Sequence, residues 1–500
     1  MGTGIIIATI ALSIGSFMNV LDSTIVNVSL SHIAGDFAIA PSQGTWVITS
    51  YAVSEAIFLV LIGWLTKRLG IVRQYIGATL LFTLASILCG IAPTFEFLLC
   101  ARVFQGVVGA SMIPLSQTLM LSIYPKEKKT LAMGIWSMTV IVAPILGPII
   151  GGWITDQLSW RWCFYINLPF GVFSSAIVYK LFKQRMREEK REKVPIDIIG
   201  LVFLTLGVGS LQLLLDKGND LDWFSSNFII VLAIISVISL ICLGIWEWNH
   251  KNPVVKIRLY GNRNFLVASI CLFISLSIYF SSVVTIPMWL QNYMGYNSTQ
   301  SGLTVATSGV AILMVTPFLG MNLQKLDSRK VIALGFFIFS LVSIFGANYN
   351  PEITQGYISR NRFFSGFGLG LFFMPLSLLA LSEISDSDIA SASGLFNFIK
   401  NLGNSVATSL SVNYWNDRQA INHQSIIESV NTGNTNFLQW MDMLSGTTAE
   451  KLETLDRIIS NQAAIMGIND MMVLSGIGML ILIPVVFLAK KPKGATHFEL

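Results

Sequence analysis

The 500-residue sequence carries little charge, since only 12% of its residues are charged and 53% are hydrophobic. Soluble domains have about 25% charged residues. No charged residue occurs between Met1 and Leu21, and apolar runs recur along nearly the whole chain. Each run is long enough to cross a hydrocarbon core of about 30 Å at 1.5 Å per residue. The sequence therefore predicts an all-α integral membrane protein, with no long soluble domain to hold an enzyme active site.

The signatures of several other protein classes are also missing. The five cysteines include no Cys-X-X-Cys pair, which argues against a disulfide framework and a zinc site. The four histidines are scattered without the spacing of metal ligands. No Gly-Lys pair occurs, which excludes a Walker A loop and ATP-driven transport by this chain. Basic residues form short clusters between apolar runs, so we expect no nucleic-acid partner. We expect no metal and no cofactor, and an energy source in a gradient.

The apolar runs predict about fourteen membrane spans and their orientation. The spans are centred near residues 18, 55, 83, 109, 142, 172, 207, 236, 277, 311, 339, 369, 401 and 479. Alternate loops carry Lys and Arg, most densely in "KQRMREEKREK" at residues 183–193. Such loops are cytoplasmic by the positive-inside rule. Because an even number of spans returns the chain to its starting side, both termini are predicted to be cytoplasmic.

Two spans share a pattern that indicates an internal duplication. "RVFQGVVGASMIPLS" begins at Arg102 and "RFFSGFGLGLFFMPLS" begins at Arg362, an offset of 260 residues that also carries Gly134 onto Gly394. Two parallel six-helix halves with two inserted helices explain this offset. We therefore predict an N-terminal half at 1–185, a connector with the inserted pair at 186–262, and a C-terminal half at 263–500.

The motifs of the first five spans carry a resemblance to a known family. They are "LDSTIVNV", "TWVITSY", "GWLTKRLG", "RVFQGVVGA" and "APILGPIIGGW". Together they resemble the fourteen-span drug/proton antiporters of the major facilitator superfamily, in the EmrB/QacA group. The resemblance covers the whole chain. It implies the major facilitator fold and proton-driven multidrug efflux by alternating access.

The motif in the fifth span has a physical interpretation of its own. Pro144 and Pro148 each remove a backbone hydrogen bond, and Gly147, Gly151 and Gly152 let a neighbouring helix approach closely. Such a helix can bend and pivot, and the resemblance implies that this pattern marks antiporters. The alternative is an ordinary packing face of small residues.

The loop motif "GWLTKRLG" resembles the gating loop of the superfamily. Its candidate residues are Gly63, Lys67, Arg68 and Gly70. The motif departs from the superfamily pattern at Lys67, where an aspartate is usual. Pairing of an acid with a helix dipole at that position is therefore in doubt, and a role in topology alone is the alternative.

Five ionisable residues fall inside predicted spans, where charge is costly and often functional. A proton-coupled carrier needs a carboxylate that binds and releases a proton as its exposure alternates, and Asp22 fits this role. The resemblance implies the same, because Asp22 matches the acid of the "LDxT" motif. Arg102 matches the fourth-span arginine that modulates a nearby acid. The alternative is a static buried ion pair between these two residues.

The other three charges leave more options open. Glu55 could be a second proton site, attract cationic substrates, or pair with Lys400 across the two halves. Lys400 could be a counter-ion or attract anions in the cavity. Arg362 is the repeat partner of Arg102, with a structural role as the expectation.

A substrate cavity is predicted between the two halves near the membrane midplane. Aromatic and amide side chains suit hydrophobic or amphipathic drugs of variable shape. The candidates in addition to Lys400 are Asn27, Tyr51, Gln105, Gln117, Trp136, Phe280, Asn397 and Asn401. For each aromatic residue alone, contact with lipid or the core is the alternative.

A polar segment at about 413–468 is predicted to form an arm on the outer face. Thr447 and Glu450 have the spacing of a capping box at the start of a helix. One apolar stripe follows, made of Leu452, Leu455, Ile458 and Ile459. The helix could lie on its own bundle or on the membrane, or it could dock to a partner.

The resemblance implies what that partner is. It implies a periplasmic adaptor of the EmrA type and an outer-membrane channel of the TolC type, with this chain as the multi-pass component in a bacterial inner membrane. The alternatives are an exporter dedicated to one endogenous metabolite, such as a siderophore or an acyl compound, and a membrane receptor or scaffold. The antiporter-like fifth span and the buried carboxylates argue against a receptor or scaffold.

Overall fold

The computed structural model describes residues 3–125, 128–189, 195, 197–250, 253, 255–430 and 447–491, and no strand occurs among them. Short 3-10 turns join the α-helices. The helices up to the end of the inserted pair are α1 (Thr3–Ile25), α2 (Leu30–Asp36), α3 (Pro41–Gly44), α4 (Trp46–Val60), α5 (Ile62–Leu69), α6 (Ile71–Gly90), α7 (Phe95–Gly109), α8 (Met112–Ile123), α9 (Lys129–Gln157), α10 (Trp162–Tyr165), α11 (Asn167–Glu188), α12 (Ile198–Lys217) and α13 (Asn227–Asn249).

The remaining helices are longer on average. They are α14 (Arg263–Tyr293), α15 (Ser298–Asn322), α16 (Ser328–Gly346), α17 (Gln355–Leu381), α18 (Ile389–Ser429) and α20 (Thr448–Val486). Side-chain caps fix several of their starts. Asn297, for example, accepts from the backbone N–H of Gln300 at 2.8 Å, which satisfies a donor that the first turn of α15 leaves free.

The number of membrane spans is close to the predicted one. Within the described residues, eleven helices are long and apolar enough to cross a membrane, or thirteen if each of two bent pairs is one span. Helix α18 is outside this set by composition, but its 41 residues extend about 60 Å at 1.5 Å per residue. The chain is a multi-pass membrane protein with the predicted all-α fold, and a total of fourteen spans stays a prediction.

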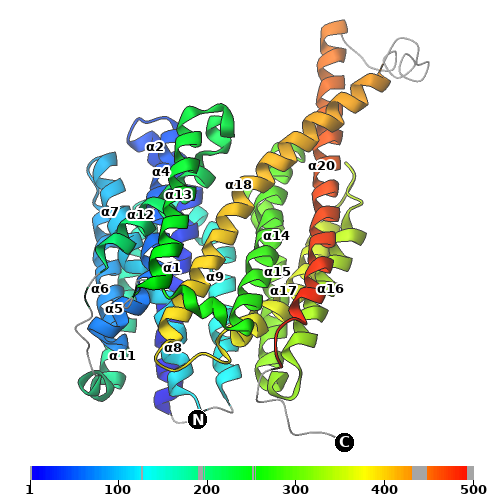
Figure 1. The fold of residues 1–500 in the computed structure, drawn as a ribbon. Coiled ribbons are helices and arrows are strands. Elements are labelled where there is room, and N and C mark those ends of the chain that lie inside the picture. The colour runs from blue at the N-terminus through cyan, green and yellow to red at the C-terminus, as the bar shows by residue number, and fades with distance from the viewer. Residues whose placement is uncertain are drawn as a thin grey trace, which may run out of the picture.

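The helices gather in two groups, which Figure 1 shows side by side. Helices α1 to α13 form one group, and α14 to α17 with α20 form the other, while α18 runs obliquely along their border. Helix α9 packs against α15 across this border. The start of α1 and the end of α20 lie at one end of the bundle, which we call the basal end; the opposite end is the distal end (Figure 1).

The inserted helices α12 and α13 pack against each other, and α12 also contacts α4 and α18. Two hydrogen bonds fix α12 and the turn after it to α18. Gln212 donates to the Ser405 hydroxyl at 2.6 Å, and Asn219 donates to the Ser409 carbonyl at 2.8 Å. The inserted pair is therefore attached through α12 both to α4 of the first group and to α18 at the border.

The polar segment at 413–468 is built differently from the prediction. The capping box is confirmed, because Thr447 and Glu450 bond each other's backbone N–H groups. The helix it starts is not a separate surface helix, however, since it continues without a break through the last span as α20. Helix α18 likewise continues to Ser429, so the two helices extend together beyond the bundle at its distal end (Figure 1). Residues 431–446 lie outside the described residues.

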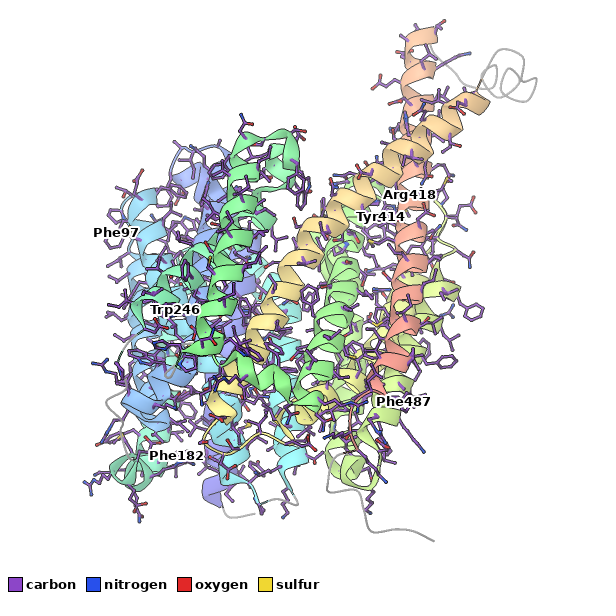
Figure 2. The ribbon with its side chains drawn as sticks, viewed as in Figure 1. Phe97, Phe182, Trp246, Tyr414, Arg418 and Phe487 are labelled. Carbon is purple, nitrogen blue, oxygen red and sulfur yellow. The ribbon has the colours of Figure 1, made fainter. Side chains whose placement is uncertain are left out.

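Contacts between α18 and α20 hold this extension together. Arg418 forms an ion pair with Asp470 at 2.7 Å, and the Trp415 indole donates to the Ala464 carbonyl at 3.0 Å. Figure 2 shows Tyr414 and Arg418 on the part of α18 that approaches α20. Two paired helices of this length position whatever surface they carry well away from the bundle.

Candidate proton and substrate site

Asp22 and Arg102 form a fully buried ion pair in the first group of helices. Arg102 Nη1 on α7 lies 2.6 Å from Asp22 Oδ2 on α1, and both side chains are 0% exposed. A buried charge without a partner is strongly destabilising, so each residue depends on the other. The two residues are therefore in direct contact, and their role in proton coupling stays a prediction.

Neutral donors complete the shell of the Asp22 carboxylate. Its second oxygen accepts hydrogen bonds from Gln105 at 3.0 Å and from Asn167 at 2.6 Å. Both amides also donate to the Ser86 hydroxyl, at 2.8 Å and 3.1 Å. Gln105, predicted for the substrate cavity, thus belongs to the Asp22 network. Asn167 and Ser86 were not predicted, although the amide of Asn167 in the apolar "YINLPFG" run could have indicated a buried polar partner.

Arg102 also contacts helix α4. Its Nε donates to the Val47 carbonyl at 3.0 Å, and its guanidinium lies 4.3 Å from the centre of the Tyr51 ring. Its Nη2 has no hydrogen-bond partner among the described residues. The Nη2 group can therefore donate to a new acceptor if the contact between Arg102 and Asp22 changes.

Tyr51 continues the network toward the other half. Its hydroxyl accepts from Asn19 at 3.0 Å and donates to Glu55 Oε1 at 3.2 Å. Glu55 Oε2 accepts from Asn401 on α18 at 3.1 Å. A continuous series of contacts thus leads from Asp22 through Arg102 and Tyr51 to Glu55 and across the border between the halves.

A cavity of about 210 Å³ lies between the two groups of helices. The predicted site residues on its wall are Glu55, Pro144, Phe280, Lys400 and Asn401. The rest of the wall is mostly apolar and includes Val20, Ile113, Val140, Ile141, Leu276, Val283, Val305, Leu369 and Phe373. Glu55 and Lys400 both face this space, but they form no ion pair within 4 Å in the described part of the chain.

The other predicted cavity residues are not on the wall. Tyr51 belongs to the network above, and the side chain of Asn27 lies outside the described residues. Gln117, Trp136 and Asn397 are buried between the halves instead. The Asn397 amide lies 3.5 Å from Gln117 Oε1, and the Trp136 ring is stacked 6.5 Å from that of Phe373.

These contacts lie on the basal side of the cavity. Gln117, Trp136, Phe373 and Asn397 are each about one turn nearer the basal end than a cavity residue of the same helix, namely Ile113, Val140, Leu369 and Lys400 respectively. They therefore close the space between the halves on the basal side. Phe373 also lines the cavity, whereas Gln117, Trp136 and Asn397 contribute to closure and not to the cavity wall.

The second half repeats the arginine but not the acid. Arg362 Nη1 donates to the Ser282 hydroxyl at 2.7 Å, eighty residues earlier in the chain, as Arg102 does to Asp22. Ser282 is offset from Asp22 by 282 − 22 = 260, which is the repeat offset. Arg362 Nη2 also donates to Asn361 at 2.7 Å. The two halves therefore share the geometry, and only the first has a carboxylate there.

Comparisons with known proteins identify the family of the chain. The family model described as Major Facilitator Superfamily matches residues 12–408. The chain belongs to the major facilitator superfamily. It is 42% identical over 500 residues to the multidrug export protein EmrB of Haemophilus influenzae, covering 99% of this chain and 98% of that protein. The predicted relationship to the EmrB group is confirmed.

Two further comparisons extend this result. The fatty acid resistance protein FarB of Neisseria gonorrhoeae is 36% identical over 494 residues, covering 98% of this chain and 97% of that protein. The crystal structure of the human organic anion transporter MFSD10 (TETRAN) matches with a TM-score of 0.57 at 10% identity, covering 95% of this chain and 99% of that one. This second likeness shows the superfamily fold. The superfamily is one of transporters rather than enzymes.

The superfamily loop motif joins the two halves at the basal end. A Cβ added to Gly63 on α5 would overlap the Ser391 side chain at the start of α18. Gly70 has φ +85°, and the Glu189 carboxylate occupies the place a Cβ would take. Glu189 Oε1 accepts from the Val72 N–H at 3.2 Å, in the first turn of α6. The Glu189 carboxylate thus lies at the N-terminus of α6, where the helix dipole favours negative charge. This acid comes from the end of α11 and not from position 67.

Lys67 has an acid of the second half within electrostatic reach. Burial raises the pKa of Asp388, but a hydrogen bond from Lys256 and the positive charges of Lys256 and Lys67 outweigh it, so this pKa lies below its ordinary value. Asp388 precedes α18, directly before the segment that Gly63 contacts. Arg68 lies over the Trp64 ring at 5.3 Å. The lysine that departs from the superfamily pattern therefore faces an acid across the border between the halves.

The fifth-span motif in α9 combines a bend with one close contact. The helix bends by 44° between Lys129–Pro144 and Ile149–Thr155. A Cβ on Gly147 would overlap Thr24 of α1, whereas a Cβ on Gly152 would have nothing within 4 Å. The Gly151 carbonyl accepts a 3.9 Å contact from the Cys163 thiol. The side chain of Pro148 lies outside the described residues.

Proposed function

We propose that this protein is a proton-driven exporter of hydrophobic and amphipathic compounds that works by drug/proton antiport and alternating access. The observation that carries the proposal is the buried Asp22–Arg102 pair and its link through Tyr51 to Glu55 on the cavity wall. The names of the similar proteins support export of several drugs.

Protonation of Asp22 is the proposed coupling step. A proton on Asp22 removes the charge that compensates Arg102, while the guanidinium stays buried and needs new acceptors. Arg102 already contacts the Val47 carbonyl and the Tyr51 ring, so its shift alters the packing of α7 against α4. Tyr51 donates to Glu55, which passes this change to the cavity wall and to Asn401 of the other half.

The two halves would then move relative to each other, so that the cavity closes on the other side. In this structure the basal side is closed by contacts such as Gln117 with Asn397. The bent helix α9 packs against α15 of the other half, which suits it as a pivot. The energy would come from the proton gradient without a cofactor, and Glu55 is a candidate second proton site.

The cellular setting is proposed by the same reasoning. The basal end, where the basic loops lie, would face the cytoplasm of a bacterium, with both termini on that side. The chain would be the inner-membrane component of a tripartite pump. The paired ends of α18 and α20 would bind an EmrA-like periplasmic adaptor. A TolC-like outer-membrane channel would be the third component of the pump.

Uphill transport in everted membrane vesicles tests the proposal. Respiration acidifies the vesicle interior, so an antiporter accumulates substrate there. A panel of pyrenebutyrate, N-phenylnaphthylamine and ethidium covers negative, neutral and positive hydrophobic probes. We expect gradient-dependent uptake of at least one probe, abolished by nigericin in potassium chloride. If no probe accumulates in vesicles that contain the folded protein, the proposed function is wrong.

A further inference from the structure

Arg362 on α17 is a buried arginine with no carboxylate in contact with it. It is only 2% exposed, and it forms no ion pair within 4 Å with any residue that the structure describes. A guanidinium cannot lose its charge by giving up a proton in a protein. A buried charge without a counter-charge is costly. The position of Arg362 therefore favours the binding of an anion.

The groups with which Arg362 interacts are neutral. Its Nη1 donates to Ser282 and its Nη2 to Asn361, both at 2.7 Å, while its Nε makes no hydrogen bond among the described residues. The Asn361 oxygen is shared, because it also accepts from the Tyr349 hydroxyl at 3.4 Å. The charge of Arg362 also acts on Tyr279 and Tyr349, which are uncharged phenols at neutral pH. These neighbours solvate the guanidinium in part and do not balance its charge.

The surroundings of Arg362 include a second buried donor. Trp289 on α14 is 0% exposed, and its Nε1 makes no hydrogen bond within the described part of the chain. The Trp289 ring is stacked on that of Tyr349, with 5.5 Å between their centres. Asp470 of the neighbouring helix α20 pairs with Arg418 at 2.7 Å. The region thus offers hydrogen-bond donors, and its acid is paired elsewhere.

The internal repeat shows which group the second half lacks. In the first half, Asp22 occupies the place of Ser282 and supplies the counter-charge of the buried arginine. Two further polar residues of the Asp22 network have smaller counterparts at the offset of 260, since Gln105 corresponds to Ser365 and Ser86 to Gly346. The second half therefore has the arginine without the acid and without the larger polar side chains that surround the acid.

The Arg362 site lies close to the cavity but not on its wall. Tyr279 and Val283, which flank Ser282 on α14, line the cavity, whereas Ser282 and Arg362 do not. One layer of side chains thus separates Arg362 from the space between the halves. An ion bound at Arg362 is therefore distinct from a compound bound in the cavity.

We propose that Arg362 binds a small monovalent anion, chloride in the cell, beside Ser282 and at the place equivalent to the Asp22 carboxylate. The Nε–H of Arg362 is the donor available to this anion, and the bond is charge-assisted. The ion supplies in the second half the negative charge that Asp22 supplies in the first. It is a structural ligand of the second half, so this inference goes beyond the proposed export function and does not depend on it.

Thermal unfolding in two salts tests the inference without a proton gradient or a substrate. The purified protein in nanodiscs of zwitterionic lipid is compared in sodium chloride and in sodium gluconate at equal ionic strength, because gluconate is a bulky polyatomic anion. We expect the melting temperature to rise with chloride concentration and to saturate, as it does for a ligand that binds only the native state. Bromide should replace chloride. The chloride NMR line should broaden in the presence of the protein and narrow again when bromide competes.

Variants assign the chloride effect to Arg362. Ser282→Asp places a fixed carboxylate beside the guanidinium, so its melting temperature should no longer depend on chloride. Arg362→Gln removes the charge and should lose the dependence as well. Arg360→Gln, at an exposed arginine of the same helix, is the matched control and should keep the chloride dependence of the wild type. Cooperative unfolding in gluconate shows that a variant is folded, and Ser282→Asp keeps the test decisive if Arg362→Gln does not fold.

Two results would overturn the inference. One is a wild type that melts at the same temperature in both salts and leaves the chloride NMR line unchanged, which would mean that neutral groups or ordered water alone satisfy Arg362. The other is a chloride dependence of equal size in the wild type and in Ser282→Asp, which would assign the effect to the salt in general or to another site. Uphill transport in vesicles is measured separately, so either result rejects this inference alone.

Discussion

Asp22 and Ser282 occupy equivalent places in the two halves, because each accepts a hydrogen bond from Nη1 of the arginine eighty residues later in the chain. The distances are 2.6 Å to Asp22 and 2.7 Å to Ser282. At this arginine site the two halves thus share one geometry and differ in one ionisable group. The proton site of the proposed mechanism is accordingly confined to the first half, and the second half supplies a neutral counterpart.

This equivalence predicts that Ser282→Asp is tolerated. The new carboxylate would lie beside the Arg362 guanidinium, as Asp22 lies beside Arg102, so the change in unfolding free energy should stay within about 1 kcal/mol. Ser275→Asp is the control, because Ser275 is also buried on α14, but within the described part of the chain its hydroxyl bonds only the Leu272 carbonyl. It should cost about 3–5 kcal/mol. Thermal unfolding in detergent measures both, and equal destabilisation would reject the equivalence.

The fifth-span motif predicts a difference between two glycines of α9. Gly147→Ala should destabilise the protein by about 1–3 kcal/mol, because its Cβ would overlap Thr24 of α1. Gly152→Ala, where a Cβ meets nothing within 4 Å, should be neutral or slightly stabilising. The readouts are thermal unfolding and uphill uptake. If both variants behave alike, the close contact of α9 with α1 is not what this motif provides.

The basal contact around Asp388 predicts a pH dependence. The pKa of Asp388 in the folded protein lies below its unfolded value of about 3.9, so its ionised form stabilises the fold above about pH 4. This contribution is lost as the pH falls through the lower folded-state pKa. The melting temperature of Asp388→Asn should therefore be below that of the wild type at pH 5–7, with a difference that narrows below about pH 4. Asp386→Asn, at an exposed position, is the control.

A difference for Asp388→Asn that does not change with pH would contradict this expectation. It would mean that the substitution acts through packing at the start of α18 instead of through the charges of Lys256 and Lys67.

The surface of α20 beyond the bundle predicts a partner contact. Leu452 and Ile458 are 51% and 39% exposed, whereas Ile459 of the same predicted stripe is 5% exposed. Replacing Leu452 and Ile458 with Asp should abolish co-purification of an EmrA-like adaptor and leave uptake into proteoliposomes unchanged. The control replaces the polar neighbours Glu453 and Arg457 with Ala. Retained association of the Asp variant would instead favour a helix that lies on the membrane or on its own bundle.

Much of the fold could be predicted because membrane spans depend on local composition. Apolar runs of about 20 residues, the basic loops and the capping box at Thr447 are all local signals. A buried ion pair between Asp22 and Arg102 was one of the alternatives from sequence, because a buried charge is costly without a partner. Asn167 was missed because the apolar run around it indicates a buried polar group but does not show which helix packs beside α1. Gln117, Trp136 and Asn397 were predicted on the cavity wall for their chemistry, but a shift of one helical turn places them in the closed layer below it.

The state of Glu55 shows the same limit. Sequence alone left pairing with Lys400 open. Asn401 and Tyr51 hydrogen-bond the Glu55 carboxylate, and the charge of Lys400 acts on it without a contact within 4 Å among the described residues. Adjacent residues on one helix differ in direction by about 100°, so the choice between Lys400 and Asn401 depends on the rotation of α18.

Proton release on substrate binding tests the central claim most directly. A probe that accumulates in vesicles is added to the purified protein in weak buffer, and a pH indicator records the protons released. The test variant is Asp22→Asn combined with Arg102→Gln, since Asp22→Asn alone would leave Arg102 buried without its partner and cost about 3–5 kcal/mol. We predict proton release from the wild type and none from the folded double variant. Equal release from both proteins would contradict the assignment of coupling to Asp22.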